Sequence, residues 1–230
     1  MRTILAAASL ALLVAGCAGV AGDPSERFYR SLGTKANPSA VVAAEIAFAR
    51  EAREEGQWTA FREFATDDAV MFVPEAVNAQ EWLSGRADPP QPVQWQPHQV
   101  WASCDGSLSV TKGAWQRPDG SVGYFTTVWE RQGRPGDDEE YRWVLDQGDT
   151  LAEPLPEPDF IGTQVADCGG GALDETLAAG PGGSGRSDDG TLAYSWTVAA
   201  DLSRTIAVTM LVDGEAEEVL TVAVAAPSGG

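Results

Sequence analysis

The side chains best able to do chemistry lie in one stretch of the chain, residues 93–147. This stretch contains the only histidine, His98, and carries Asp146 near its end. Either residue could act as a general base near neutral pH, because histidine titrates there and burial raises the pKa of an aspartate toward it. The other conspicuous polar or amphipathic side chains of the stretch are Tyr124, Trp101 and Trp129.

Each candidate base also has a purely structural explanation. A lone histidine that follows Pro97 is more often exposed or hydrogen bonded within the fold, and an aspartate near a strand end more often caps a turn. No serine stands in a G-x-S-x-G elbow, so a hydrolase triad has no support. A single histidine and scattered cysteines do not make a zinc site, and we expect no metal.

Four strand-like runs must position these residues. The first run ends at Asp105-Gly106, and this dipeptide between alternating runs is a strong hairpin signal. Pro118-Asp119-Gly120 separates the second run from the third, and a loop rich in glycine and charge precedes the fourth. We predict an antiparallel meander of residues 93–104, 107–116, 122–131 and 140–147.

Both faces of the predicted sheet carry apolar side chains, which alternate along each strand. In the third run, Tyr124, Thr126 and Val128 share one face, and Phe125, Thr127 and Trp129 share the other. In the fourth run, Tyr141, Trp143 and Leu145 would lie opposite Val144 and Asp146. Such a sheet needs two covers, so we expect helices on one face and the C-terminal segment or a partner chain on the other.

Two helices are predicted upstream of the meander. Asn37-Pro38 is a start signal for a helix over residues 39–55, with an apolar stripe of Val42, Ile46 and Ala49. A second helix over residues 58–65 places Trp58 and Phe61 on one side, where they either line a pocket or form plain core. A short strand over residues 69–73 and a helical turn over residues 79–83 follow.

This order of elements resembles the nuclear transport factor 2-like superfamily, the cone-shaped, cystatin-like α+β fold of ketosteroid isomerases and polyketide cyclases. The resemblance covers roughly residues 38–148. It is carried by Phe48-Ala49-Arg50-Glu51, Trp58-Thr59-Ala60-Phe61, Asp105-Gly106-Ser107-Leu108, Tyr124-Phe125-Thr126-Thr127-Val128-Trp129 and Trp143-Val144-Leu145-Asp146.

The resemblance implies a pocket between the concave sheet and the helices. In the isomerases of this superfamily an aspartate base works beside hydrogen-bond donors there. The residues of this chain that would then line the pocket are Trp58, Phe61, Trp101 and Trp129, with Asp146, His98 and Tyr124 as the catalytic candidates.

The C-terminal part of the chain departs from the minimal superfamily pattern. Residues 151–190 are rich in proline and glycine and are predicted to be a connector. Residues 180–185 fit G-x-G-x-x-G, but Pro181 occupies the turn and no strand precedes it, so no cofactor is expected. Three strands, over 191–199, 204–212 and 217–225, would form a β appendage too small for a core of its own, which should pack on the open face of the sheet.

The N-terminus contains sequence signals that predict where the protein is located. Residues 1–16 read as a signal peptide, and Val14-Ala15-Gly16-Cys17 resembles a bacterial lipobox, which implies a lipid on Cys17. The alternative is an ordinary secretory signal. A lipid would anchor the protein to the membrane through a tether over residues 17–36, and Ala18 in place of Asp favours the outer membrane, facing the periplasm.

The net charge limits the kinds of partner that the protein can bind, and the cysteine content predicts a disulfide. The chain has 34 Asp and Glu against 15 Lys and Arg, a net charge of −19, which repels phosphate backbones and argues against nucleic-acid binding. Outside the signal, Cys104 and Cys168 are expected to form a disulfide, the alternative being two buried free thiols.

These observations predict five segments: 1–16 signal peptide, 17–36 tether, 37–150 main domain, 151–190 connector and 191–230 appendage. The expected function is a lipid-anchored envelope protein that binds a small apolar or amphipathic ligand, or a protein partner, without catalysis. One alternative is an isomerase, cyclase or dehydratase-like enzyme that uses Asp146 or His98 as base. Another is a homodimer or docking protein whose domain holds no ligand.

Overall fold

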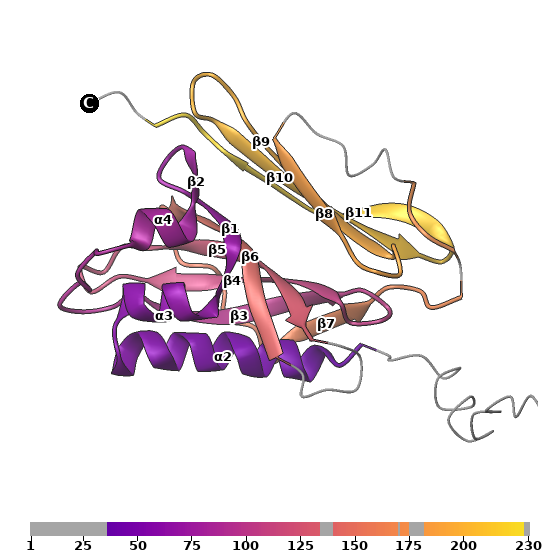
Figure 1. Cartoon of the computed structure of the whole chain (residues 1–230), viewed down its shortest axis with the longest axis horizontal. Coiled ribbons are helices and arrows are strands. Elements are labelled where there is room, and N and C mark those ends of the chain that lie inside the picture. Colours follow the sequence, from indigo (N-terminus) through magenta and orange to yellow (C-terminus); the bar gives the residue numbers. More distant parts are fainter. Residues whose placement is uncertain (1–35, 134–139, 170, 175–181, 228–230) are drawn as a thin grey trace, which may run out of the picture. The chain divides into compact units, whose positions relative to one another are not determined.

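The computed structural model describes residues 36–133, 140–169, 171–174 and 182–227 (Figure 1). The predicted signal peptide, the lipidation site Cys17 and all of the tether except Ala36 lie outside the described residues. Within the described ranges, none of the helices has the length and apolar character needed to cross a membrane.

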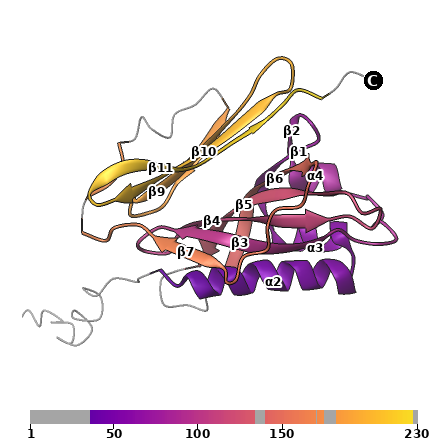
Figure 2. The same cartoon turned by 180° about the vertical axis from the view of Figure 1, so that it is seen from behind.

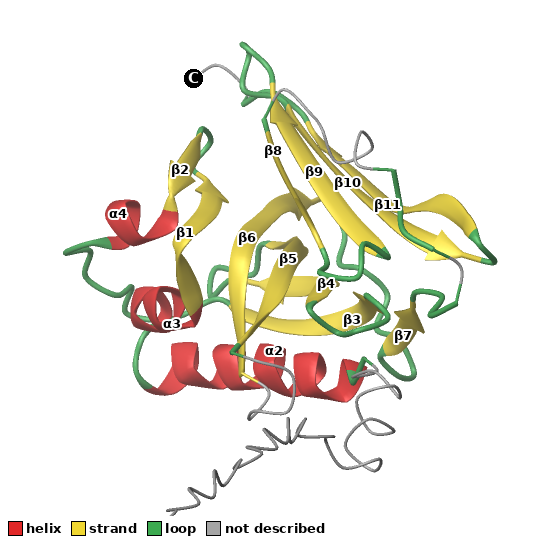
Figure 3. Cartoon of the chain, turned by 45° about the vertical axis from the view of Figure 1, so that its right-hand side comes forward, coloured by secondary structure: helices red, strands yellow, loops and turns green. Residues whose placement is uncertain are grey.

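The described chain is an α+β structure with a few helices and two sheets (Figure 3). The helices are α2 (Pro38–Glu54), α3 (Gln57–Phe64) and α4 (Ala79–Leu83). The larger sheet contains, in spatial order, β2 (Ala76–Asn78), β1 (Ala65–Phe72), β6 (Glu140–Leu151), β5 (Val122–Gln132), β4 (Leu108–Gln116), β3 (Gln94–Ala102) and β7 (Gly162–Val165). The smaller sheet contains β11 (Glu215–Val224), β10 (Arg204–Val212), β9 (Leu192–Val198) and β8 (Gly183–Arg186).

The predicted meander is confirmed, since β3, β4, β5 and β6 pair in sequence and antiparallel. The sheet as a whole is mixed, because further strands join the antiparallel meander at both edges. Strand β1 pairs parallel with β6, and β7 pairs parallel with β3 at the opposite edge. The residue pattern predicted part of β1 but not β7, and it does not say which edge of a sheet a distant strand joins.

Helices α2 and α3 cover one face of the larger sheet. The buried side of α2 is Val41, Glu45, Phe48, Ala49 and Ala52. Of the predicted stripe Val42, Ile46 and Ala49, the burial of Ala49 is confirmed and that of Ile46 is wrong, because the Ile46 side chain is 52% exposed. Two neighbouring apolar stripes were available on this helix, and the structure buries the one that contains Glu45 because hydrogen bonds from three side chains satisfy the carboxyl group.

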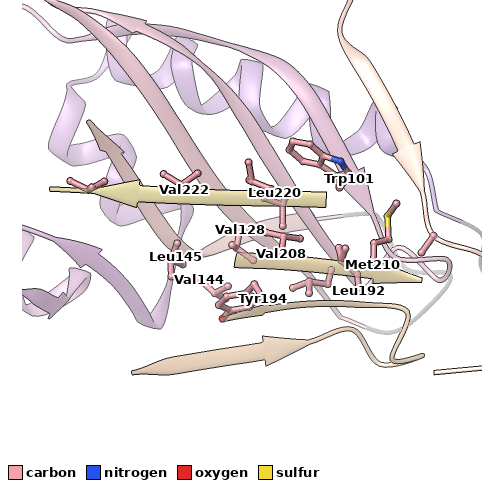
Figure 4. Packing of buried hydrophobic residues seen from close by; sticks show 14 residues of the cluster. Trp101, Val128, Val144, Leu145, Leu192, Tyr194, Val208, Met210, Leu220 and Val222 are labelled. Carbon is pink, nitrogen blue, oxygen red and sulfur yellow. The ribbon is translucent and has the colours of Figure 1, made fainter. Parts of the chain in front are cut away.

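The C-terminal sheet covers the other face, as predicted. Figure 4 shows side chains of the larger sheet, among them Trp101, Val128 and Leu145, packed with Leu192 and Val208 of the smaller one. The appendage has four strands and not three, because β8 forms within the segment predicted to be a connector. Strand β7 also forms within that segment, but it joins the larger sheet beside β3 (Figure 2). A face that could have required a partner chain is therefore buried within this one.

Two turns with one residue pattern hold the sheets together. The pattern S-x-D-G-[S/T]-L occurs at residues 103–108, between β3 and β4, and at 187–192, between β8 and β9. In each turn one aspartate oxygen accepts bonds from the flanking hydroxyls and from the backbone N–H two residues on, for Asp105 at 2.8–3.0 Å and for Asp189 at 2.7–3.0 Å. These are Asx-type turns, which local side-chain bonds stabilise.

The two turns also bond to each other. The backbone N–H of Cys104 donates to Thr191 Oγ1, and that of Asp188 donates to Ser107 Oγ, both at 2.9 Å. Asp189 Oδ2 accepts from the backbone N–H of Asp105 at 2.9 Å. The first two bonds join equivalent positions of the pattern in opposite directions, so the turns are related by a local pseudo-twofold axis.

The predicted disulfide is confirmed at the same junction. Cys104 lies within the first turn, and its sulfur is bonded to that of Cys168. The disulfide and the paired turns therefore fix one end of the β3–β4 hairpin to the C-terminal part of the chain.

Candidate functional site

A cavity of about 290 Å³ lies between the helices and the larger sheet. Its wall comes from α2, α3, α4 and strands β1, β3, β4, β5 and β6. Aromatic rings dominate the lining: Phe48, Trp58, Phe61, Phe72, Trp82, Trp95, Trp115 and Phe125. The few ionisable side chains on it are Asp146, Asp149 and Arg117.

The start of α3 is held in place by Asp88, which is distant in sequence. Its carboxylate accepts bonds from the backbone N–H groups of Trp58 and Thr59 and from the Thr59 hydroxyl. Burial raises the pKa of Asp88, but these hydrogen bonds outweigh it and leave the pKa below its ordinary value. Gly56, with φ of +124°, lies where a Cβ would clash with that carboxylate. This cap fixes Trp58 and Phe61 in the cavity wall.

Aromatic side chains of α3 and α4 pack together at one side of the cavity. Trp58 meets Trp82 with ring centroids 5.7 Å apart and planes at 84°, and it meets Phe61 at 5.6 Å and 81°. Edge-to-face contacts of this kind stabilise aromatic clusters beyond the area that they bury.

A β-bulge brings Asp146 to the cavity. Along β5 and β6, Trp129 pairs with Trp143 but Val128 pairs with Leu145, so Val144 is an extra residue. Both Val144 and Leu145 then pack toward the C-terminal sheet, and Asp146 lies on the same side as Trp143. The predicted alternation, with Asp146 opposite Trp143, is therefore wrong. Bulges often aim a side chain into a site in this way.

Asp146 is a partly buried carboxyl group with one side-chain hydrogen bond. Thr127, its partner across the β5–β6 ladder, donates from Oγ1 to Asp146 Oδ1 at 2.8 Å. Burial raises the pKa of Asp146 to about 6, and the Thr127 bond acts in the opposite direction. No basic side chain among the described residues forms an ion pair with it.

Glu45 is a second carboxyl group, fully buried behind the cavity wall. Its Oε1 accepts from the Trp95 indole N–H at 2.8 Å, and its Oε2 accepts from the Thr111 hydroxyl at 2.6 Å and the Trp129 indole N–H at 3.0 Å. Burial raises the pKa of Glu45 to about 7; the negative charge of Asp146 adds to the rise, and the three hydrogen bonds oppose it.

The surroundings of Glu45 fit both of its protonation states. The Thr111 hydroxyl lies 2.6 Å from Glu45 Oε2 and 3.4 Å from the Thr127 carbonyl oxygen. It can donate to an ionised Glu45, or accept from a protonated one while it turns toward the carbonyl group. The cavity surface therefore carries the carboxyl groups of Asp146 and Asp149, and Glu45 lies behind the wall with donors that suit either of its protonation states.

The structure separates the catalytic candidates. Tyr124 packs with the core between the two sheets, where burial raises its pKa. His98 lies at a second hollow, of about 360 Å³, where burial lowers its pKa and the Glu157 carboxylate opposes this shift. Neither side chain lines the cavity that contains Asp146.

The pocket candidates divide in the same way. Trp58 and Phe61, for which a pocket and a plain core were both open, lie on the cavity wall. Trp101 lies on the opposite face of the sheet, in the core shared with the C-terminal strands. Trp129 faces the helices but is fully buried behind the lining, where it donates to Glu45.

Sequence reasoning missed Glu45, Trp82, Trp95 and Trp115. The last two are ladder partners, but extending the Asp105-Gly106 hairpin would place Gln96 opposite Trp115. Trp95 becomes the partner only through an irregularity between Pro97 and Gln99, which has no local signal. Glu45 had no signal either, because a single glutamate on an amphipathic helix is ordinarily assigned to the exposed face.

Comparisons with known proteins add little to this geometry. No protein-family model matches the sequence, and no curated protein matches it either. The chain is similar to a crystal structure described as that of a "putative aromatic ring hydroxylase" from Novosphingobium aromaticivorans, with 12% sequence identity and a TM-score of 0.35 over 50% of this chain and 90% of the other. A similarity of that size carries no argument about function.

Proposed function

We propose that this chain is a ligand-binding domain of the nuclear transport factor 2-like type, which takes a small apolar or amphipathic molecule into the aromatic cavity without catalysis. A lipid on Cys17 would hold it on the periplasmic side of the outer membrane. The observation that supports the binding function is the cavity itself, about 290 Å³ in volume and lined by eight aromatic side chains.

The composition of the lining matches what ligand pockets need. Such sites are concave and mostly apolar, with a few polar groups that orient the ligand. Here the rings would bury apolar surface at about 25 cal/mol per Å². Asp146 and Thr127 would provide the polar contact, because both line the cavity at its sheet side.

The test is native mass spectrometry of the protein purified from its own host, with and without a denaturing step. A reproducible small mass that is lost on denaturation would support the proposal and identify the ligand. The same spectra would report a homodimer. A protein that carries no small mass and also shows no binding in a screen of apolar compounds would overturn the proposal.

A second candidate function is an isomerase, cyclase or dehydratase-like enzyme with Asp146 as general base. The observation that favours it is the carboxyl group at the cavity surface with a pKa of about 6, since a base near the working pH is efficient. His98 is less suited to act with it, because it lies at a separate hollow.

This second function is tested by hydrogen–deuterium exchange into a panel of enolisable ketones in D2O. Exchange catalysed by the wild type, lost by at least ~100-fold in Asp146→Asn and retained in His98→Ala, would establish Asp146 as a base. Exchange that is unchanged in Asp146→Asn would remove this role.

A further inference from the structure

The Asp146 carboxylate faces the cavity without a counter-ion. The described residues provide it with one hydrogen bond, from Thr127, and no ion pair. A carboxylate held among apolar rings is costly unless a cation or several donors compensate it. Glu45, behind the wall, cannot do so because it is acidic itself and is fully occupied by its own donors.

The rings around the cavity meet at steep angles. Phe61 and Trp95 are 6.0 Å apart with planes at 72°, and Trp58 and Trp82 are 5.7 Å apart at 84°. Rings held at such angles turn their faces in different directions, a feature that they share with the aromatic cages that bind alkylated ammonium groups.

Two of the indoles already bind cationic side chains of the chain itself. The Arg86 guanidinium lies 3.4 Å from the ring centroid of Trp82, and that of Arg117 lies 4.5 Å from Trp115. These contacts show that the indoles of the wall accept cations on their faces. Trp58 and Trp95 have no such contact among the described residues.

From these observations we infer that the ligand of the cavity is an organic cation, a substituted ammonium ion, which pairs with the Asp146 carboxylate and contacts the faces of the surrounding indoles. This inference rests on the proposed binding function and narrows it to one class of ligand. The charges of the lining favour a cation over an anion, because Asp146 and Asp149 outnumber the one basic residue, Arg117, which is exposed and stacked on Trp115.

The test uses three probes of nearly equal shape and different charge: phenyltrimethylammonium, tert-butylbenzene and benzenesulfonate. Each is titrated into the full chain and followed by calorimetry and by the fluorescence of its eight tryptophans. We expect the cation to bind at least about tenfold more tightly than the neutral compound, and the sulfonate to bind most weakly.

The variant Asp146→Asn keeps the shape of the site and removes its charge. It should weaken binding of the cation by about tenfold or more and leave binding of tert-butylbenzene unchanged, which also shows that the variant is folded. The matched control is Asp159→Asn, which removes one charge from an exposed residue outside the lining and should change cation binding less than threefold.

The outcomes distinguish this inference from the function on which it rests. Equal binding of the cation and the neutral compound, or tighter binding of the sulfonate, would overturn the cationic ligand and leave the binding function in place. If no probe binds, the cationic ligand is overturned, and the native mass measurement alone decides the binding function.

Discussion

Glu45 is the residue that ties the candidate site to the helix layer. Its carboxyl group receives hydrogen bonds from one residue on each of three neighbouring strands, Trp95 on β3, Thr111 on β4 and Trp129 on β5. Trp95 is also part of the cavity wall. The position of that wall therefore depends on a polar group that does not itself line the cavity.

Replacing Glu45 by alanine should leave three buried donors without an acceptor and open a void. We expect Glu45→Ala to lower the free energy of unfolding by ~3–5 kcal/mol. Glu45→Gln, which retains one acceptor oxygen and the side-chain volume, should cost only about 1 kcal/mol at pH 6. Urea denaturation measures both variants, and equal losses would contradict a role for the hydrogen bonds.

The raised pKa values of Glu45 and Asp146 make the fold sensitive to pH. Both carboxyl groups bind protons more tightly in the folded state, at pKa values of about 7 and about 6. Their contribution to stability is therefore complete below the ordinary carboxyl pKa, near 4, and is lost as the pH rises through 6 and 7. The free energy of unfolding should fall by roughly 3 kcal/mol between pH 5 and pH 8.

The measurement is urea denaturation across this pH range for the wild type and for Glu45→Gln/Asp146→Asn. The double variant should show a flatter pH dependence. His98 acts in the opposite direction, because burial lowers its pKa, but its effect is common to both proteins and cancels in the comparison. Identical slopes would exclude the two carboxyl groups as the source.

Among single residues, the sequence identified candidates by the chemistry of their side chains and by their place in a predicted strand or helix. Asp146, Trp58 and Phe61 were candidates and lie at the cavity, whereas His98 and Tyr124 lie elsewhere. Glu45 was not predictable, since its burial depends on three donors that come from strands 50 to 84 residues away in sequence.

The paired turns are the elements that join the two sheets, and Asp189 accepts hydrogen bonds from both of them. One of its oxygens accepts three hydrogen bonds within its own turn, and the other accepts the backbone N–H of Asp105 across the junction. Asp201 accepts the equivalent local bonds from Ser203 in an exposed turn that has no such partner turn.

These two aspartates form a matched pair for mutation. Asp189→Ala should lower the free energy of unfolding by ~2–4 kcal/mol, because it removes local bonds and leaves a partly buried N–H of the other turn unpaired. Asp201→Ala should cost about 1 kcal/mol or less. Thermal and urea denaturation measure the difference, and equal losses would mean that the contact between the turns adds no stability.

The helices and strands that have local sequence signals were predicted correctly. The prediction failed for features that form only because two strands pair. The helical turn Ala79–Leu83 and strand Arg204–Val212 have the predicted bounds. The bulge at Val144 has no local signal, so the alternation of β6 was extrapolated through it. Strand β8 is rich in glycine and forms because it pairs with β9, which composition alone does not reveal. The repeated turn pattern at 103–108 and 187–192 could have been found by an internal comparison of the sequence.

A disulfide links the main domain covalently to the C-terminal part of the chain. Cys104 and Cys168 are 64 residues apart. A cross-link over a loop of this length stabilises by restricting the unfolded chain, by ~3–5 kcal/mol on the chain-entropy model. Cys104→Ser/Cys168→Ser should lose about that much in urea denaturation. A loss below about 1 kcal/mol would show that the paired turns alone hold this junction.

The fold class could be predicted from the sequence, but the way in which distant strands pair could not. The α+β composition, the central meander and a C-terminal sheet on its second face all follow from turn signals and from a meander that is apolar on both sides. The mixed pairing and the fourth strand of the smaller sheet depend on contacts between distant segments, for which a single sequence has no marker.

The parallel pairing of β1 with β6 sets an order of events during synthesis. Met71 pairs with Asp146, which is made 75 residues later, and Phe48 and Phe61 pack on Trp129 and Trp143 of the same late strands. At ~5–20 residues per second, about 4–15 s separate the two halves of this pair. During that interval Trp129 and Trp143 are not yet available, so Phe48 and Phe61 lack two of the rings that bury them in the folded protein.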